Sequence, residues 1–285
     1  MEQQIAFIVW RESIEAMLVV GILFTWLRAS PEGRKGLPWL WAGVAAGLGL
    51  AVLLALVLLG ISSWLSDTGQ EWFQAIMALA ACALIVQMVY WMRLHGRTLK
   101  RELEQGASRD LEADNWWGLL TLVAIAVARE GSETVVFLYG SIAAGAAQGS
   151  AVRLALAGAL GFGAALLSFW LLQAGGRLIT WRRFFKLTEI MLLLLAGALL
   201  VSGMDHLISL DALPTLVDPV WDTSALLDTQ GGLGKVLADF AGYRAVPSLT
   251  QVLLWALYWV VAIVVLKRVD VSAGRARVAS GGARA

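Results

Sequence analysis

Cysteine, histidine and charged residues are all scarce in this 285-residue sequence. Cys82 is the only cysteine and there are two histidines, which argues against a disulfide framework and a cysteine-rich metal site. Charged residues make up 15% of the chain, compared with about 25% in a typical soluble domain. The net charge is +1, and the sequence has neither a basic nucleic-acid-binding face nor a phosphate-binding glycine loop. Soluble, disulfide-rich and nucleic-acid-binding classes are therefore disfavoured.

The sequence has long apolar runs instead. Hydrophobic residues make up 59% of the chain and gather in seven runs of about 20 residues, the length at which an α-helix crosses roughly 30 Å of hydrocarbon. The runs are 5–27, 38–61, 72–92, 116–139, 154–174, 187–208 and 249–266. Lipid offers no partner to free backbone amides, and these runs exceed the length of a β-barrel strand. We therefore predict an all-α, polytopic membrane protein with seven transmembrane helices.

The basic residues predict how the chain is oriented. Most of the 22 Lys and Arg residues follow the first, third, fifth and seventh runs, so the positive-inside rule places the N-terminus outside and the C-terminus inside. We expect residues 1–267 to form one transmembrane domain and residues 268–285 to form a basic, flexible cytoplasmic tail. The first residues do not resemble a cleaved signal peptide, so the first helix is expected to remain in the mature protein.

Two of the apolar runs contain the same charged motif. Residues 11–15 read R-E-S-I-E and residues 129–133 read R-E-G-S-E, both within the longer pattern A-x-x-V-x-R-E-x-x-E. A charge at the centre of a bilayer costs about 2.5 to 3.5 kcal/mol on insertion scales. Six such charges in two helices therefore indicate a function.

The spacing of the motifs predicts one shared site. Glutamates three positions apart project from the same helical face, and each arginine lies four residues before the second glutamate. The motifs are offset by 118 residues and three membrane crossings, so their helices run in opposite directions and place the clusters at similar depth, in the outer half of the membrane. Helices 1–3 and 4–6 are thus predicted to form an inverted repeat.

The chemistry of the motifs predicts a hard cation. Four carboxylates against two guanidinium groups leave two excess negative charges, and neither cysteine nor histidine lies beside the motifs. We expect the transported ion to be a hard cation, manganese and magnesium among them, or protons, since the residues alone do not choose among these ions, and we expect no cofactor. The predicted metal ligands are Glu12, Glu15, Glu130 and Glu133, supported by Arg11 and Arg129.

Two other interpretations of the motifs stay open at this point. The charges could form ion pairs that lock the two helices together, although this leaves two glutamates without a compensating charge. A glutamate could also act as the general base of an intramembrane enzyme, but Ser13 and Ser132 have no histidine partner in sequence. We therefore predict a transporter and not an enzyme.

These residues together resemble the oxidase-dependent iron permease family, which includes fungal high-affinity iron permeases and bacterial EfeU-type transporters. The duplicated R-E-x-x-E motif is the signature of that family, and further matches are Glu71, the Y-W-M-R of residues 90–93 and the W-D-T-S-A-L-L of residues 221–227. The resemblance covers nearly the whole chain. It implies seven transmembrane helices, iron import across the bacterial cytoplasmic (inner) membrane, and iron binding by the glutamates of both motifs. It also implies an oxidase or iron-delivery protein as partner. It does not decide whether the transported iron is ferrous or ferric.

Acidic residues outside the motifs are secondary candidates. Glu71, at the outer end of helix 72–92, and Asp222, in the last outer loop, are possible accessory ligands. Gln74 stands where relatives often have a second acid, so an accessory outer site is expected to be weaker here. Glu189, 118 residues on from Glu71, could be an exit acid for the ion, but a pair with Lys186 is the favoured interpretation.

A further capture site is possible near the end of helix 187–208. Asp205, His206 and Asp211 lie close together in sequence there, although loops commonly carry such residues.

Four further features concern packing and local structure. Leu233, Val236, Leu237 and Phe240 follow helical spacing and predict a short amphipathic helix in the outer loop. The glycines of residues 43–47 and 158–163 predict close helix contacts. Residues 96–115 mix both charge signs and predict a solvated helix or linker. Cys82 is predicted to be a small core residue.

Overall fold

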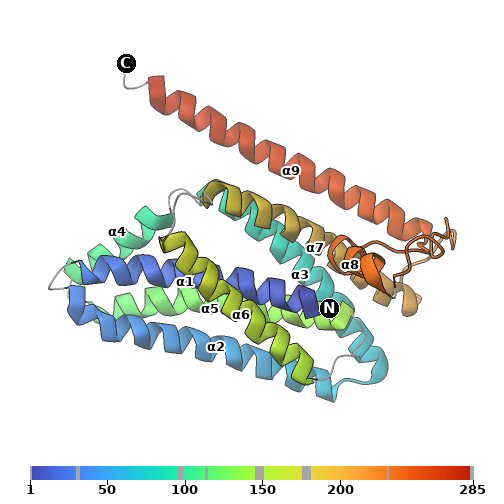
Figure 1. Cartoon of the computed structure of the whole chain (residues 1–285), viewed down its shortest axis with the longest axis horizontal. Helices are drawn as coiled ribbons and strands as arrows, with labels where there is room; N and C mark the ends of the chain where they lie inside the picture. Colours follow the sequence, from blue (N-terminus) through green and yellow to red (C-terminus); the bar gives the residue numbers. More distant parts are fainter. Residues whose placement is uncertain are drawn as a thin grey trace. The chain divides into compact units, whose positions relative to one another are not determined.

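The computed structural model describes residues 2–29, 33–95, 99–112, 115–144, 151–174, 181–229 and 231–282. Every regular element in these ranges is helical, which confirms the predicted all-α fold. The elements, shown in Figure 1, are α1 (Glu2–Arg28), η1 (Gly33–Gly36), α2 (Leu37–Trp64), α3 (Asp67–His95), α4 (Leu99–Glu112), α5 (Trp116–Ala144), α6 (Ala151–Ala174), α7 (Trp181–Ser209), α8 (Gly232–Ala241) and α9 (Leu249–Gly282).

Five helical segments of the described chain are long and apolar enough to cross a membrane. They are Gly33–Trp64, Asp67–Leu94, Val152–Leu171, Lys186–Ser209 and Leu249–Arg268. Helices α1 and α5 have comparable lengths, 27 and 29 residues, but each carries the three charges of an R-E-x-x-E motif within its apolar run. The chain is therefore a multi-pass membrane protein, and the total of seven spans stays a prediction.

Each of the seven apolar runs lies within a helix, and outside α9 the helices extend beyond the runs by several residues at most. The longest extension is in α9, which is helical to Gly282 although the apolar run ends at residue 266. Residues 283–285 of the predicted tail lie outside the described residues, and the flexibility of the tail stays a prediction. Helix α8 confirms the amphipathic segment predicted in the outer loop.

The segment predicted as a solvated helix or linker forms α4, and the helical alternative is the right one. Residues 96–98 and 113–114 of that segment lie outside the described residues. Two α4 side chains, Leu103 and Ala107, are buried in an apolar cluster with residues of α1 and α5. This buried face is hard to predict from the sequence, because most residues of the segment are polar or charged and only a few are apolar.

The helices divide into two compact units. The first comprises residues 1–70 and 98–185 and thus contains α1, α2, α4, α5 and α6; the second comprises residues 71–97 and 186–285 and contains α8, α9 and most of α3 and α7.

In the first unit, α1 and α5 pack side by side in antiparallel directions. Val19, Leu23 and Leu27 from the second half of α1 share a buried cluster with residues from the first half of α5, which are Leu119, Val123 and Val127. This confirms that the two motif-bearing helices are neighbours, as the shared-site prediction requires.

Glycines bring two further helices close to this pair. A Cβ atom on Gly47 of α2 would lie 2.7 Å from Val127 Cβ and 2.8 Å from Ala124 O of α5, and one on Gly161 of α6 would overlap the backbone of Ala6 in α1. Only glycine permits such backbone approach. The predicted close contacts are thus confirmed at Gly47 and Gly161, whereas Gly158 and Gly163 face open space.

In the second unit, α3 and α7 run antiparallel. A Cβ atom added to Gly203 of α7 would lie 2.9 Å from the side chain of Leu79 in α3, so the two helices pack closely there. Cys82 is buried in α3 and free, which confirms its predicted place in the core. Helix α9 is joined to α7 where the Tyr258 hydroxyl donates a hydrogen bond to Leu193 O at 2.6 Å.

Candidate metal site

Helices α1 and α5 bring three of the four motif glutamates together. Glu12, Glu130 and Glu133 each offer one carboxylate oxygen, and these oxygens lie within 4.8 Å of one another. Two oxygens on opposite sides of a hard cation are about 4 to 5 Å apart. The three carboxylates can therefore contact one ion. Their side chains are buried or nearly so, with 1%, 8% and 12% exposure in that order.

The two arginines hold some of these carboxylates in place. Arg11 is 2% exposed; its Nη1 donates a hydrogen bond to Glu12 Oε1 at 2.7 Å, and its Nη2 pairs with Glu15. On α5, Arg129 Nε donates to Glu133 Oε1 at 3.0 Å. The arginine four residues before the second glutamate thus reaches it in both motifs, as the helical spacing predicts.

Three carboxylate oxygens of the cluster lack a hydrogen-bond partner in the described part of the chain. They are the Oε2 atoms of Glu12, Glu130 and Glu133, and all three are buried. A buried carboxylate oxygen without a donor is unfavourable. A cation among the three would satisfy all of them at once.

Glu15 differs from the other predicted ligands. Its carboxylate is tied to Arg11 and does not belong to the group of three. It nevertheless interacts electrostatically with Arg129 and Glu133 across the helix pair. Its role as a ligand stays a prediction.

Glu71 and His206, two secondary candidates, lie together in the second unit. His206 Nδ1 is 2.7 Å from Glu71 Oε2, and the Ser209 hydroxyl donates to the same oxygen at 3.4 Å. Within the described residues, these groups do not form a cluster of three or more metal-ligating side chains.

The expected pairing of Glu189 with Lys186 is wrong. Arg93 Nε of α3 donates to Glu189 Oε1 at 2.6 Å, and Arg93 Nη1 reaches Leu266 O of α9 at 3.5 Å. In the sequence, Arg93 belongs to the Y-W-M-R of residues 90–93 and to the basic residues of the positive-inside rule, with no predicted partner. The partner was missed because the pair is 96 residues apart and depends on the antiparallel packing of α3 and α7.

Asp205 and Asp222 have local partners of their own. Asp205 accepts hydrogen bonds from Arg244 Nε at 3.2 Å and from Gln251, neither of which the sequence singled out. Asp222 is exposed, and Ser224 donates to its Oδ1 from the hydroxyl at 2.6 Å and from the backbone at 2.9 Å. These two bonds lower the pKa of the Asp222 carboxyl. Asp205 and His206 therefore have different partners, and Asp211 is exposed.

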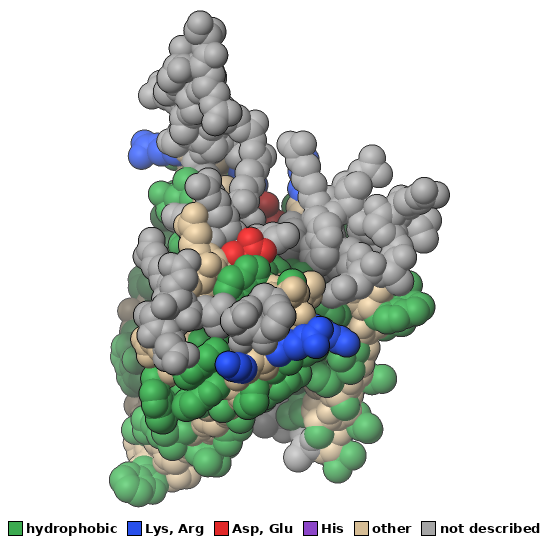
Figure 2. Space-filling model, turned by 90° about the vertical axis from the view of Figure 1, so that its left-hand side faces the viewer, with side chains coloured by type: hydrophobic (Ala, Val, Ile, Leu, Met, Phe, Trp, Pro, Cys, Tyr) green, Lys and Arg blue, Asp and Glu red, His purple; other side chains and the backbone are tan. Residues whose placement is uncertain are grey.

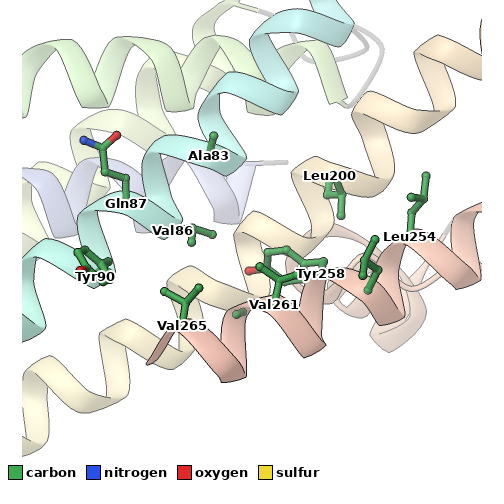
Figure 3. Close-up of a pocket in the computed structure, with 11 residues that line it drawn as sticks. Ala83, Val86, Gln87, Tyr90, Leu200, Leu254, Tyr258, Val261 and Val265 are labelled. Atoms are coloured by element: carbon green, nitrogen blue, oxygen red, sulfur yellow. The ribbon is translucent and has the colours of Figure 1, made fainter. Parts of the chain in front are cut away.

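A groove in the second unit is chemically different from the glutamate cluster. It has a volume of about 520 Å³ and is lined by residues of α3, α7 and α9, nearly all of them apolar (Figure 3). Tyr258, one of the few polar residues in the lining, already donates its hydroxyl hydrogen to Leu193 O. The groove lacks carboxylates and histidines, so it offers a hard cation no anionic ligand.

A set of long apolar helices that holds buried carboxylates and a buried arginine defines a class, namely polytopic membrane transporters of ions. Residues 3–276 match the iron permease FTR1 family, and the chain belongs to that family. It is accordingly a transporter and not an enzyme.

Three relatives illustrate the match. The ferrous iron permeases EfeU of Escherichia coli O157:H7 and of Escherichia coli O6:K15:H31 are 32% and 31% identical over 267 residues, covering 90% of this chain and 92% of theirs. The ferrous iron permease EfeU of Yersinia pestis is 26% identical over 262 residues, covering 90% of each chain. No solved structure matches the chain.

Proposed function

We propose that this permease imports ferrous iron with high affinity across the bacterial cytoplasmic membrane and binds it between the two R-E-x-x-E motifs. The observation that carries the proposal is the buried group of Glu12, Glu130 and Glu133, whose oxygens lie within 4.8 Å of one another. Iron is favoured over manganese and magnesium, because the relatives that match 90% of the chain are named ferrous iron permeases. Another hard cation, or protons, on the same carboxylates is the alternative.

In this proposal the arginines and Glu15 prepare the site. Arg11 fixes Glu12 through one nitrogen and Glu15 through another, so the Glu12 carboxylate is oriented before the ion arrives. Arg129 orients Glu133 in the same way from α5. When all six groups are charged, the cluster carries two excess negative charges, which a divalent cation neutralises. The same excess disfavours anions.

Packing in the first unit supports the inverted repeat. The offset of 118 residues that relates the motifs also relates Gly43 of α2 to Gly161 of α6. Gly43 lies against α5 and Gly161 lies against α1, so each motif helix receives a glycine from the other half of the chain. The same offset relates Glu71 to Glu189, which lie near the starts of α3 and α7. We infer that helices one to three and four to six are related halves with the metal between them.

We further propose seven spans with the N-terminus outside. The exposed residues Arg28, Arg34 and Lys35 lie where α1 ends and α2 begins, and basic side chains are visible on the corresponding face in Figure 2. By the positive-inside rule this end of α1 faces the cytoplasm. Ferrous iron would then reach the site from the end where α1 begins, supplied by an iron-delivery partner outside.

Uptake of radiolabelled iron into proteoliposomes under reducing conditions tests the proposal. Glu12→Gln, Glu130→Gln and Glu133→Gln should each reduce uptake about 100-fold or more, because replacing a charged ligand forfeits roughly 3 kcal/mol. Glu15→Gln should have a smaller effect, since its carboxylate lies outside the group of three. Glu104→Gln, in α4, is the control. Normal uptake by all three ligand variants would end the proposal, and preferred uptake of manganese over iron would establish the alternative.

A further inference from the structure

Three layers of side chains follow one another along α1 and α5, between the glutamates and the end of the bundle where α1 begins. Both helices advance about 1.5 Å per residue and they run in opposite directions. Four residues back from Glu12 is Ile8, and four residues on from Glu133 is Phe137, each about 6 Å farther along its helix axis. Four more residues reach Gln4 and Ser141, on the same level about 12 Å away. From the glutamates toward the start of α1, the side-chain layers are therefore charged, then apolar, then polar.

The apolar layer is buried, because Ile8 and Phe137 are both 0% exposed. On the other side of the glutamates lies the buried cluster that extends from Val19 to Leu27 on α1 and from Leu119 to Val127 on α5. Buried apolar side chains therefore lie along α1 and α5 on both sides of the glutamates. The barrier on the side of Ile8 is one side-chain layer thick, whereas the cluster on the opposite side spans more than two helical turns.

The polar layer beyond Ile8 and Phe137 contains a side chain whose hydroxyl is unsatisfied. Ser141 is 0% exposed, and its Oγ has no hydrogen-bond partner in the part of the chain that the structure describes. Other hydroxyls of α5 are satisfied in the usual way by the preceding turn: Ser132 donates to Arg129 O and Thr134 donates to Glu130 O, both at 2.8 Å. Gln4, on the same level of α1, is 4% exposed although its side chain is polar.

We propose that Gln4 and Ser141 form a first subsite for the incoming hydrated divalent cation and that Ile8 and Phe137 form the gate between this subsite and the glutamates. The inference rests on the proposed function and adds a route of access to it. A hydroxyl and a carboxamide supply neutral oxygen ligands, which hold a hard cation weakly enough to release it to three carboxylates. An apolar constriction one layer thick excludes water and ions until its side chains move apart.

The gate predicts slow exchange of bound iron. Purified protein is loaded with ferrous iron in detergent without oxygen, and the rate of removal by an excess of chelator is measured. Phe137→Ala and Ile8→Ala should release iron about tenfold faster than the unmodified protein. Ile125→Ala, which removes an exposed apolar side chain of the same helix, should release it at the unmodified rate. Phe137→Leu, which retains most of the apolar volume, should fold normally and give an intermediate rate.

The subsite predicts a change in the concentration dependence of uptake. Ser141→Ala and Gln4→Leu should raise the half-saturating iron concentration in proteoliposomes about three- to tenfold, the effect of losing one polar contact, and leave the maximal rate unchanged. Thr121→Ala is the control, because its hydroxyl donates to Trp117 O at 2.7 Å on an exposed face of α5.

The outcomes separate this inference from the proposed function. If Glu130→Gln abolishes iron binding while the Ile8, Phe137, Gln4 and Ser141 variants all exchange and transport iron normally, the gate and subsite are wrong and the metal site stands. If Glu130→Gln binds iron as well as the unmodified protein, the metal site itself is wrong.

Discussion

Arg11 is the residue on which the geometry of the first motif depends. It is almost completely buried, and its planar guanidinium contacts Glu12 with one nitrogen and Glu15 with another. A buried arginine is tolerated only when its charge is matched, and here two carboxylates of its own helix match it. The side chain orients Glu12 toward Glu130 and Glu133 without belonging to the group of three.

Arg11→Lys should therefore impair the protein although the charge is kept. A lysine presents a single nitrogen and cannot hold both carboxylates in the plane that the guanidinium provides. We expect iron uptake to fall about tenfold or more, corresponding to one charged hydrogen bond of roughly 1.5 to 3 kcal/mol. Arg34→Lys, at an exposed position of η1, is the matched control and should transport iron normally. Equal uptake by both variants would show that Arg11 contributes charge alone.

At the scale of elements, the site depends on helices that approach closely through glycine. Gly47 of α2 lies against α5 near Val127, three residues before Glu130, so this contact fixes the helix that carries the second motif. Gly161 of α6 lies against the backbone of Ala6 in α1, so this contact fixes the helix that carries the first motif.

Gly47→Ala should destabilise the protein measurably. The added methyl would come within 2.9 Å of Val127 Cβ, Ala124 O and Ala128 N, so α2 and α5 must move apart. Overpacking of this kind costs about 1 to 3 kcal/mol. Gly49→Ala, where nothing lies within 4 Å of the added methyl, should not destabilise the helix. Thermal unfolding in detergent compares the two variants, and an unchanged midpoint for Gly47→Ala would contradict the packing.

The sequence predicts the helices well and their partners only in part. Apolar runs locate α1, α2, α3, α5, α6, α7 and α9 because a helix must cover about 20 residues to cross hydrocarbon. The sequence did not predict that α4 has a buried face, because Leu103 and Ala107 are surrounded in sequence by charged residues. The R-E-x-x-E spacing predicts the pairs within each helix, such as Arg129 with Glu133. It carries no information on the pair of Arg93 and Glu189, which depends on the antiparallel packing of α3 and α7.

At the scale of the whole molecule, the chain places its glutamate cluster in one compact unit and its apolar groove in the other. The first unit contains both motifs, their arginines and the proposed gate. The second contains Glu71 with His206 near one end of α7 and Arg93 with Glu189 near the other, so a hydrogen bond and an ion pair join α3 to α7 at opposite ends. The duplicated motif predicted that four glutamates would meet. The structure brings three of them together, while the fourth, Glu15, pairs with Arg11 and lies outside the group.

The anomalous scattering of crystals soaked with ferrous iron, collected at the iron absorption edge, tests the central claim most directly. The account predicts one principal iron peak about 2.0 to 2.5 Å from carboxylate oxygens of Glu12, Glu130 and Glu133, and loss of that peak in Glu130→Gln. A principal peak at Glu71 and His206 instead, with the three glutamates remote from any iron in protein that transports it, would contradict the account.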